Sequence, residues 1–200
     1  VLCVFPFEPP LLAQHGIDAT YVGHPLADVI PTMPDATAAR QRLGLSADRP
    51  VVALLPGSRA SEIDHLAARF VEAARRMQAE QPGLQFVLPA VPDQRGRIDG
   101  IVARHGMAAS VTVVTGQSHA TLAACDVALV ASGTATLEAA LFRRPMVIAY
   151  HMHPLSWWIM RGKRLQPWVG LPNILCEAFV VPEFLQQACT PATLARATLD

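Results

Sequence analysis

The sequence predicts an α/β domain built on a doubly wound parallel β-sheet. Short apolar runs of strand length recur along the chain, and a helical or loop segment separates each run from the next. Strands that alternate with helices indicate βαβ units, whose strands are parallel. Hydrophobic residues make up 52% of the 200 residues and charged residues only 16%, so the chain can bury a sizeable core.

The N-terminal part of the chain has weaker signals. An apolar run over residues 1–7 leads into a helical segment over 8–14, and a short strand is expected over 19–22. The stretch IPTMPDAT (30–37) contains two prolines and shows no periodicity, which indicates a linker. The main sheet is therefore expected to begin after this linker.

Beyond the linker, apolar runs predict strands at residues 51–55, 84–88, 111–114, 127–130 and 145–149. A helix is expected after the first of these strands, because apolar residues recur with helical spacing from Ile63 to Met77. Ser61 and Asp64 are three residues apart, as in a capping box, and they predict that this helix begins at Ser61.

Two strand-to-helix junctions are suited to binding an anion. They are PGSR (56–59), directly after the predicted strand 51–55, and SGT (132–134), one residue after the predicted strand 127–130. In doubly wound sheets, ligands bind outside the carboxyl ends of the strands. Gly57 and Gly133 carry no Cβ and let the backbone approach a ligand closely. Free N–H groups at the start of a helix favour anions. The two junctions together therefore predict a diphosphate site.

The side chains at these junctions support that interpretation. Ser58, Ser132 and Thr134 can donate hydrogen bonds, and Arg59 carries a planar cation that fits phosphate oxygens. Glu138 lies one helical turn beyond Thr134, where a carboxylate can accept hydrogen bonds from a ribose diol. The alternatives are a local Gly-Ser turn, a surface ion pair of Arg59 and a solvated glutamate. Neither junction has the G-x-G-x-x-G or the Walker pattern.

Composition argues against several other functions. The 16 basic and 16 acidic residues cancel, which disfavours nucleic-acid binding, and no apolar run is long enough to span a membrane. The four cysteines are far apart and are interpreted as reduced thiols. His151 and His153 alternate on an extended segment without a third ligand, so no metal site is expected.

Five motifs carry a resemblance to a known family. They are LLPGSRASEI (54–63), ASGTATLEAAL (131–141), PMVIAYHMHP (145–154), VGLPNIL (169–175) and VVPEFLQ (180–186). Together with FPFEPPLLAQHGIDATYVGHPLAD (5–28), they cover nearly the whole chain and resemble lipid-A-disaccharide synthases. The resemblance implies an inverting GT-B glycosyltransferase that joins UDP-2,3-diacylglucosamine to 2,3-diacylglucosamine 1-phosphate, giving lipid A disaccharide 1-phosphate and UDP.

The resemblance also implies roles for individual residues. Its Rossmann-like C-terminal lobe binds the UDP-sugar with no metal or other cofactor, and the assigned residues are Gly57, Ser58, Arg59, Gln117, Ser132, Gly133, Thr134, Glu138 and Asn173. Arg59 is the catalytic candidate, because its cation would stabilise the departing diphosphate. Gln117 is assigned to the base and Asn173 to a sugar or phosphate, although Asn173 after Pro172 also suits a turn.

The implied organisation has three parts. Residues 1–34 would be the end of the acceptor lobe and the hinge, 35–187 the UDP-sugar-binding lobe, and 188–200 the start of a truncated helical segment. The general base is expected outside this chain, and we expect the chain alone to be inactive. His24 is interpreted as structural, and Cys176-Glu177-Ala178 departs from the small, glycine-containing step usual in the family.

Two rival classes of function stay open at this point. One is another GT-B enzyme, such as a UDP-N-acetylglucosamine epimerase or the muramyl-peptide glucosaminyltransferase. The other is a non-catalytic nucleotide-binding domain. A homodimer is a candidate assembly, and no nucleic-acid partner is expected.

One aromatic and basic segment suggests a membrane surface. All three tryptophans lie in HPLSWWIMRGKRLQPW (153–168). The residues assigned to contact with an anionic bilayer are Trp157, Trp158, Arg161, Lys163 and Arg164. The alternative is a core helix whose tryptophans pack on the sheet. With the resemblance, this segment predicts a cytoplasmic enzyme that is peripheral on the inner face of the bacterial inner membrane.

Overall fold

The computed structural model describes residues 1–153, 157 and 166–200. Its strands are β1 (Leu2–Cys3), β2 (Thr20–Tyr21), β3 (Val51–Leu55), β4 (Gln85–Ala90), β5 (Val111–Thr115), β6 (Val127–Ala131), β7 (Met146–Tyr150) and β8 (Glu183–Leu185). Its α-helices are α1 (Glu8–Ala13), α2 (Leu26–Val29), α3 (Ala36–Arg42), α4 (Ala60–Glu80), α5 (Arg95–Arg104), α6 (Ser118–Ala124), α7 (Thr134–Leu141), α9 (Leu171–Cys176) and α10 (Pro191–Leu199). Short 3₁₀ turns occupy Pro92–Gln94 and Gln186–Ala188.

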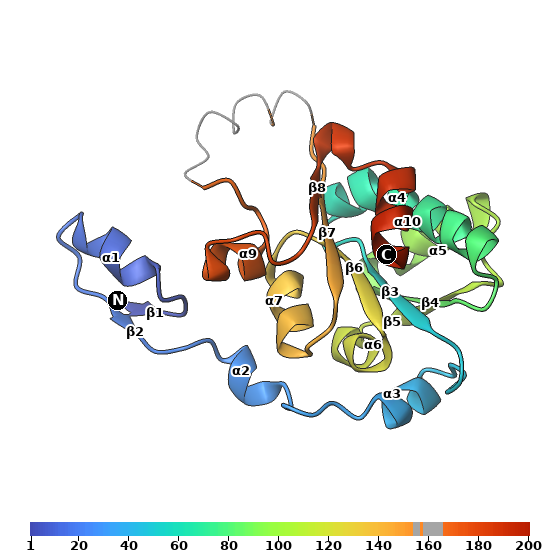
Figure 1. The fold of residues 1–200 in the computed structure, drawn as a ribbon, viewed down its shortest axis with the longest axis horizontal. Helices are drawn as coiled ribbons and strands as arrows, with labels where there is room; N and C mark the ends of the chain where they lie inside the picture. Colours follow the sequence, from blue (N-terminus) through green and yellow to red (C-terminus); the bar gives the residue numbers. More distant parts are fainter. Residues whose placement is uncertain (154–156, 158–165) are drawn as a thin grey trace.

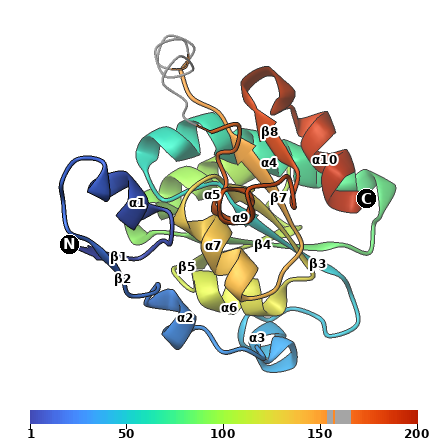
Figure 2. The same ribbon diagram turned by 60° about the vertical axis from the view of Figure 1, so that its left-hand side comes forward.

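A six-stranded parallel sheet with the strand order β5-β4-β3-β6-β7-β8 forms the centre of the fold. Helices cover both of its faces, with α4, α5 and α10 on one and α3, α6 and α7 on the other (Figures 1 and 2). The predicted α/β fold class, a Rossmann-like doubly wound parallel sheet, is confirmed. The central strand β3 is buried along its whole length, as expected for a strand that helices cover on both faces.

Two hydrophobic clusters fill the space on either side of the sheet. One includes Phe70 of α4, Phe86 of β4 and Leu194 of α10, all fully buried. The other includes Ile30, from the predicted linker, and Phe142. The last helix therefore shares a core with α4, and the linker contributes a core residue. The assignment of these segments to separate lobes stays a prediction.

The small sheet β1–β2 stands apart from the main sheet. Its two strands are parallel, and the chain reaches the main sheet through α2 and α3, which pass along its lower side in Figure 1. Leu2 and Tyr21 are exposed on it. This segment contributes little to the packed core.

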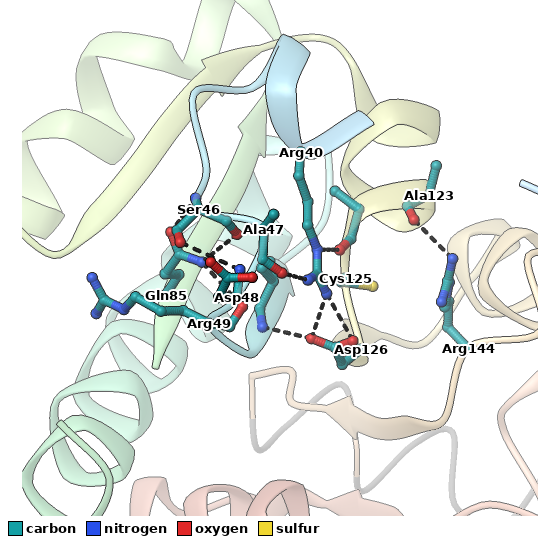
Figure 3. Close-up of polar contacts among 12 residues, drawn as sticks. Arg40, Ser46, Ala47, Asp48, Arg49, Gln85, Ala123, Cys125, Asp126 and Arg144 are labelled. Atoms are coloured by element: carbon teal, nitrogen blue, oxygen red, sulfur yellow. Dashed lines mark hydrogen bonds and ion pairs between the residues drawn. The ribbon is translucent and has the colours of Figure 1, made fainter. Parts of the chain in front are cut away.

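A polar cluster fixes α3 at the amino ends of the strands (Figure 3). Nη2 of Arg40 donates to both carboxylate oxygens of Asp126, each at 2.8 Å. Nε of Arg40 donates to the carbonyl oxygen of Ala124 at 3.0 Å. The same Asp126 accepts a hydrogen bond from the N–H of Val51, at the start of β3, at 2.8 Å. Helix α3 is thereby tied to the amino ends of the two central strands, β3 and β6.

The predicted start of α4 is wrong in detail. The helix begins at Ala60, with Arg59 as the N-cap residue, and Glu62 rather than Asp64 completes the capping box. Asp64 instead forms an ion pair with Arg97 of α5. The Ser-x-x-Asp pattern was misleading because β3 ends so close to the helix that the cap falls two residues earlier.

Candidate functional site

The sheet changes its winding direction between β3 and β6. Strands β4 and β5 follow on one side of β3, whereas β6, β7 and β8 follow on the other. The two connections that leave β3 and β6 at their carboxyl ends therefore diverge and open a crevice, which is where ligands bind in folds of this kind. Both predicted junctions lie at this point.

A cleft of about 370 Å³ occupies the crevice. Its lining residues come from the carboxyl ends of β3 to β6, from the loops that follow them, and from α4, α6 and α7: Leu55, Gly57, Ser58, Arg59, Glu62, Pro89, Ala90, Val91, Gly116, Ser118, Ala131, Ser132, Gly133, Thr134, Ala135 and Glu138. The cleft brings together all of the predicted UDP-sugar residues except Gln117 and Asn173.

At the β3–α4 junction, a carboxylate already occupies the N–H donors. Glu62 Oε2 accepts hydrogen bonds from the N–H of Ser58 at 2.9 Å and of Arg59 at 3.1 Å. Glycine at position 57 makes this contact possible, because a Cβ there would overlap the Glu62 side chain. The backbone φ of Gly57 is +110°, which also disfavours other residues. The expectation of free N–H groups is therefore wrong for this junction.

The guanidinium of Arg59 remains accessible. Its Nη1 lies 3.0 Å from Glu62 Oε1, but 81% of the Arg59 side chain is exposed. An exposed pair of this kind contributes little to stability. The other N–H groups of the guanidinium are free to bind a ligand oxygen in the cleft.

At the β6–α7 junction, the backbone donors are open. Gly133 has a φ of +154° and a ψ of −162°, a conformation that is essentially restricted to glycine, and nothing lies within 4 Å of a Cβ built on it. The N–H groups of Thr134 and Ala135 belong to the first turn of α7, where no acceptor within the helix is available. This helix start can receive an anion.

Ser132 has a different role from the predicted one. Its Oγ donates to the carbonyl oxygen of Val169 at 2.7 Å, and its N–H donates to the carbonyl oxygen of Ala149 at 2.9 Å. Both donors are thus used within the protein. Ser132 lines the cleft and joins it to the segment before α9, but its donors do not point at a ligand.

Glu138 faces the cleft from the second turn of α7 and is not a freely solvated glutamate. Only 18% of its side chain is exposed, and its Oε2 lies 3.5 Å from Nε2 of His119. The sequence prediction missed His119, which lies on α6 and shares no local motif with Glu138.

Comparisons with known proteins identify the family of the chain. The family model described as lipid-A-disaccharide synthetase matches residues 1–200. The chain belongs to this family. It is 63% identical over 199 residues to a lipid-A-disaccharide synthase of Albidiferax ferrireducens and 48% identical over 200 residues to one of Pseudomonas syringae. It spans about half the length of these relatives, 51% and 52% respectively.

Solved structures share the fold at low sequence identity. A UDP-GlcNAc 2-epimerase of Neisseria meningitidis superposes with a TM-score of 0.67 at 12% identity, covering 98% of this chain and 51% of the epimerase. The glycosyltransferase WaaG superposes with a TM-score of 0.59 at 14% identity, covering all of this chain and 53% of WaaG. These similarities show the fold only.

Two residues assigned from the lipid-A-disaccharide synthetase resemblance do not line the cleft. Gln117 lies between the lining residues Gly116 and Ser118 and caps α6 with a left-handed φ of 59°. Asn173 is fully buried. Its Nδ2 donates to Val181 O and Glu183 Oε1, at 2.9 and 2.7 Å.

The amide oxygen of Asn173 is also occupied. It accepts hydrogen bonds from the N–H groups of Val180 and Val181, at 2.8 and 2.9 Å. Asn173 lies within helix α9 and does not form a turn after Pro172, so the turn interpretation is wrong as well. Its amide bonds to residues 180, 181 and 183 and does not reach the cleft. Nearby, Glu177 adopts a left-handed φ of 50° at the end of α9, where other residues than glycine are strained.

The membrane assignment falls mostly outside the described residues. Four of the five assigned residues lie outside the described residues: Trp158, Arg161, Lys163 and Arg164. The fifth, Trp157, is half-buried, and its backbone N–H donates to the carbonyl oxygen of His153 at 3.0 Å. Within the described ranges, no helix is both long and apolar enough to cross a bilayer.

Two histidines, His24 and His151, are in structural positions. His24 accepts a hydrogen bond from the N–H of Leu26 at its Nδ1, at 3.2 Å. Burial and the nearby cation of Arg69 lower the pKa of His151, whose Nε2 lies 3.1 Å from the Arg69 guanidinium. Among residues 1–153, 157 and 166–200, no group of three or more potential metal ligands occurs.

Proposed function

We propose that this chain is the UDP-sugar-binding half of a lipid-A-disaccharide synthase. In the whole enzyme, a hydroxyl of diacylglucosamine 1-phosphate attacks the anomeric carbon of UDP-diacylglucosamine and gives its proton to a general base, which we expect outside this chain. The bond between that carbon and the diphosphate breaks, and UDP leaves. The family membership favours this reaction over that of an epimerase or a muramyl-peptide glucosaminyltransferase.

One observation carries the proposal for the site. At the crossover between β3 and β6, the cleft combines the open start of α7, the exposed cation of Arg59 and the carboxylate of Glu138. A diphosphate over the helix start would accept hydrogen bonds from Thr134 and Ala135. Arg59 would face it across the cleft, and Glu138 would accept from the ribose hydroxyls.

Arg59 carries the cation that suits a catalytic role at the leaving group. Negative charge builds up on the diphosphate as the sugar leaves, and a preorganised cation stabilises that charge. Loss of one such group typically costs about 3 kcal/mol in the transition state. The proposal needs no metal ion, because the cation and the helix start together offset the charge of the leaving group.

Calorimetric titration with UDP and with uridine tests the site. Arg59→Ala should weaken UDP binding and leave uridine nearly unchanged, whereas Glu138→Ala should weaken both. Arg76→Ala is the matched control, because Arg76 is also exposed on α4 and paired with a glutamate, Glu72. Equal UDP affinity of the parent and all three variants would contradict the proposed site.

We also propose that the segment 153–168 docks on an anionic membrane surface. The acyl chains of the proposed substrates favour an enzyme that binds at a bilayer. Flotation with anionic liposomes should retain the parent enzyme and release a Trp157→Ser/Trp158→Ser variant. Neutralising Arg161, Lys163 and Arg164 should have the same effect, and parental binding should decline with added salt. Equal flotation of the three folded proteins would contradict docking.

A further inference from the structure

The two acidic side chains of the cleft each have one basic partner. Glu62 contacts Arg59 at 3.0 Å, and Glu138 contacts His119 at 3.5 Å. A diphosphate in the cleft is an anion, and two carboxylates beside it would repel it unless a nearby cation or N–H donor offsets their charge. Arg59 is already part of the proposed site, whereas His119 has no role in it.

The fold directs His119 toward Glu138. Gly116 and Gln117 have positive φ values of 64° and 59°, so the chain turns sharply after β5. The first turn of α6, which carries His119 directly after the cleft residue Ser118, then faces α7. Glu138 lies on the adjoining face of that helix.

Phe142 holds the ring of His119 in place. The two rings lie 5.4 Å apart between centroids and meet edge to face at 61°. Phe142 is four residues after Glu138, so both lie on one side of the α7 segment. With one ring edge against Phe142, Nε2 points to the carboxylate, and 43% of the His119 side chain is still exposed.

We propose that His119 is a positioning residue for the nucleotide: it orients the Glu138 carboxylate toward the ribose hydroxyls and offsets its charge beside the diphosphate. This inference rests on the proposed function, since it concerns the same cleft. His119 acts through Glu138 and does not itself contact the reacting atoms. At 3.5 Å, Nε2 of His119 is within ion-pair distance of Glu138 Oε2, and an N–H on Nε2 directed at the carboxylate limits its rotation.

The test compares UDP with 2′-deoxy-UDP by calorimetry. The parent should bind UDP more tightly than 2′-deoxy-UDP, and His119→Ala should lower the affinity for UDP roughly five- to tenfold, about the effect of one polar contact. The same substitution should reduce the preference for UDP over 2′-deoxy-UDP, because the carboxylate is no longer held for the 2′-hydroxyl. His119→Gln, which retains an N–H donor, should recover part of both losses.

A double variant separates positioning from a general structural effect. Because His119 acts through Glu138, His119→Ala should cause no further loss in a Glu138→Ala background. His105→Ala is the matched control, because His105 lies 3.7 Å from Glu72 in a similar pair outside the cleft. It should leave UDP binding unchanged.

The outcomes distinguish the inference from the function on which it rests. The positioning role is wrong, and the proposed site stands, if Glu138→Ala lowers the affinity for UDP but His119→Ala does not. The same conclusion follows if the losses of UDP affinity in the two single variants simply add in the double variant. If the folded parent does not bind UDP, both are wrong. Circular dichroism checks that each variant is folded.

Discussion

The β3–α4 and β6–α7 junctions have similar sequences and line the same cleft, but they present different groups to a ligand. At the first junction, Glu62 caps its own helix and takes the N–H groups of Ser58 and Arg59. At the second, the corresponding third residue of the helix is Thr136, whose Oγ1 donates to the carbonyl of Gly133 at 2.7 Å. A threonine cannot fold back as far as a glutamate, so the helix start stays open.

This difference assigns separate tasks to the two junctions. The β6–α7 junction offers backbone N–H donors to an anion, whereas the β3–α4 junction offers a side-chain cation from a rigid, self-capped helix start. A phosphate group that entered the β3–α4 donors would first have to displace the Glu62 carboxylate. We therefore expect the diphosphate to lie over α7, with Arg59 reaching it from the opposite side.

The largest effect is expected for Gly57→Ala, and Gly133→Ala at the other junction is its comparison. Gly57→Ala should lower the free energy of unfolding by about 3 kcal/mol or more, because it combines backbone strain with loss of the Glu62 cap. Gly133→Ala should cost about 1–2 kcal/mol, since only backbone strain is added in open space. Urea unfolding monitored by circular dichroism measures both. Equal losses would remove the structural distinction between the junctions.

An effect smaller than that of Gly57→Ala is expected at Asn173, which supports only the second junction. The Asn173 amide donates a hydrogen bond to the Glu183 carboxylate, which in turn accepts hydrogen bonds from the N–H groups of Val169 and Gly170. Val169 is also the residue whose carbonyl oxygen accepts from Ser132. Asn173→Ala should lower the free energy of unfolding by about 2–3 kcal/mol, because buried partners lose their hydrogen bonds. UDP affinity of the folded variant should stay within about twofold of the parent. A selective loss of UDP binding without destabilisation would restore Asn173 to the site.

The smallest effect is expected for Glu62→Gln. The amide keeps the shape of the cap but removes its charge at the helix start, which should cost about 1 kcal/mol in thermal or urea unfolding. UDP affinity should rise by a few-fold, since a carboxylate beside the diphosphate is lost. A marked decrease in UDP affinity would instead show that Glu62 contacts the ligand directly. Glu72→Gln, farther along the same helix, serves as the control.

Local patterns in the sequence predicted most of the fold. The buried strands β3 to β7 were located to within about two residues, because a short, continuous apolar run between turn signals is typical of a buried strand. The short strand β8 was missed, because it is half-buried and begins with Glu183. Helix α2, with four residues, gave no periodic signal.

The site was predicted less completely, and for physical reasons. The position of the cleft followed from the strand-to-helix junctions, which are local. The partner of Glu138 could not be predicted from a local pattern, because only the packing of α6 against α7 brings His119 close to it. Glu62 had a local signal, as the third residue of a helix that starts directly after β3, but Ser61 and Asp64 matched the usual capping pattern better. Asn173 could be placed only once β8 was known.

The most direct test of the two-junction account is an amide chemical-shift titration of the isotope-labelled chain with UDP. The account predicts the largest changes at the N–H groups of Gly133, Thr134 and Ala135, with much smaller changes at Ser58 and Arg59, whose N–H groups stay bonded to Glu62. Uridine, which lacks the diphosphate, should leave the start of α7 nearly unchanged. Larger changes at Ser58 and Arg59 than at the start of α7 would contradict the account.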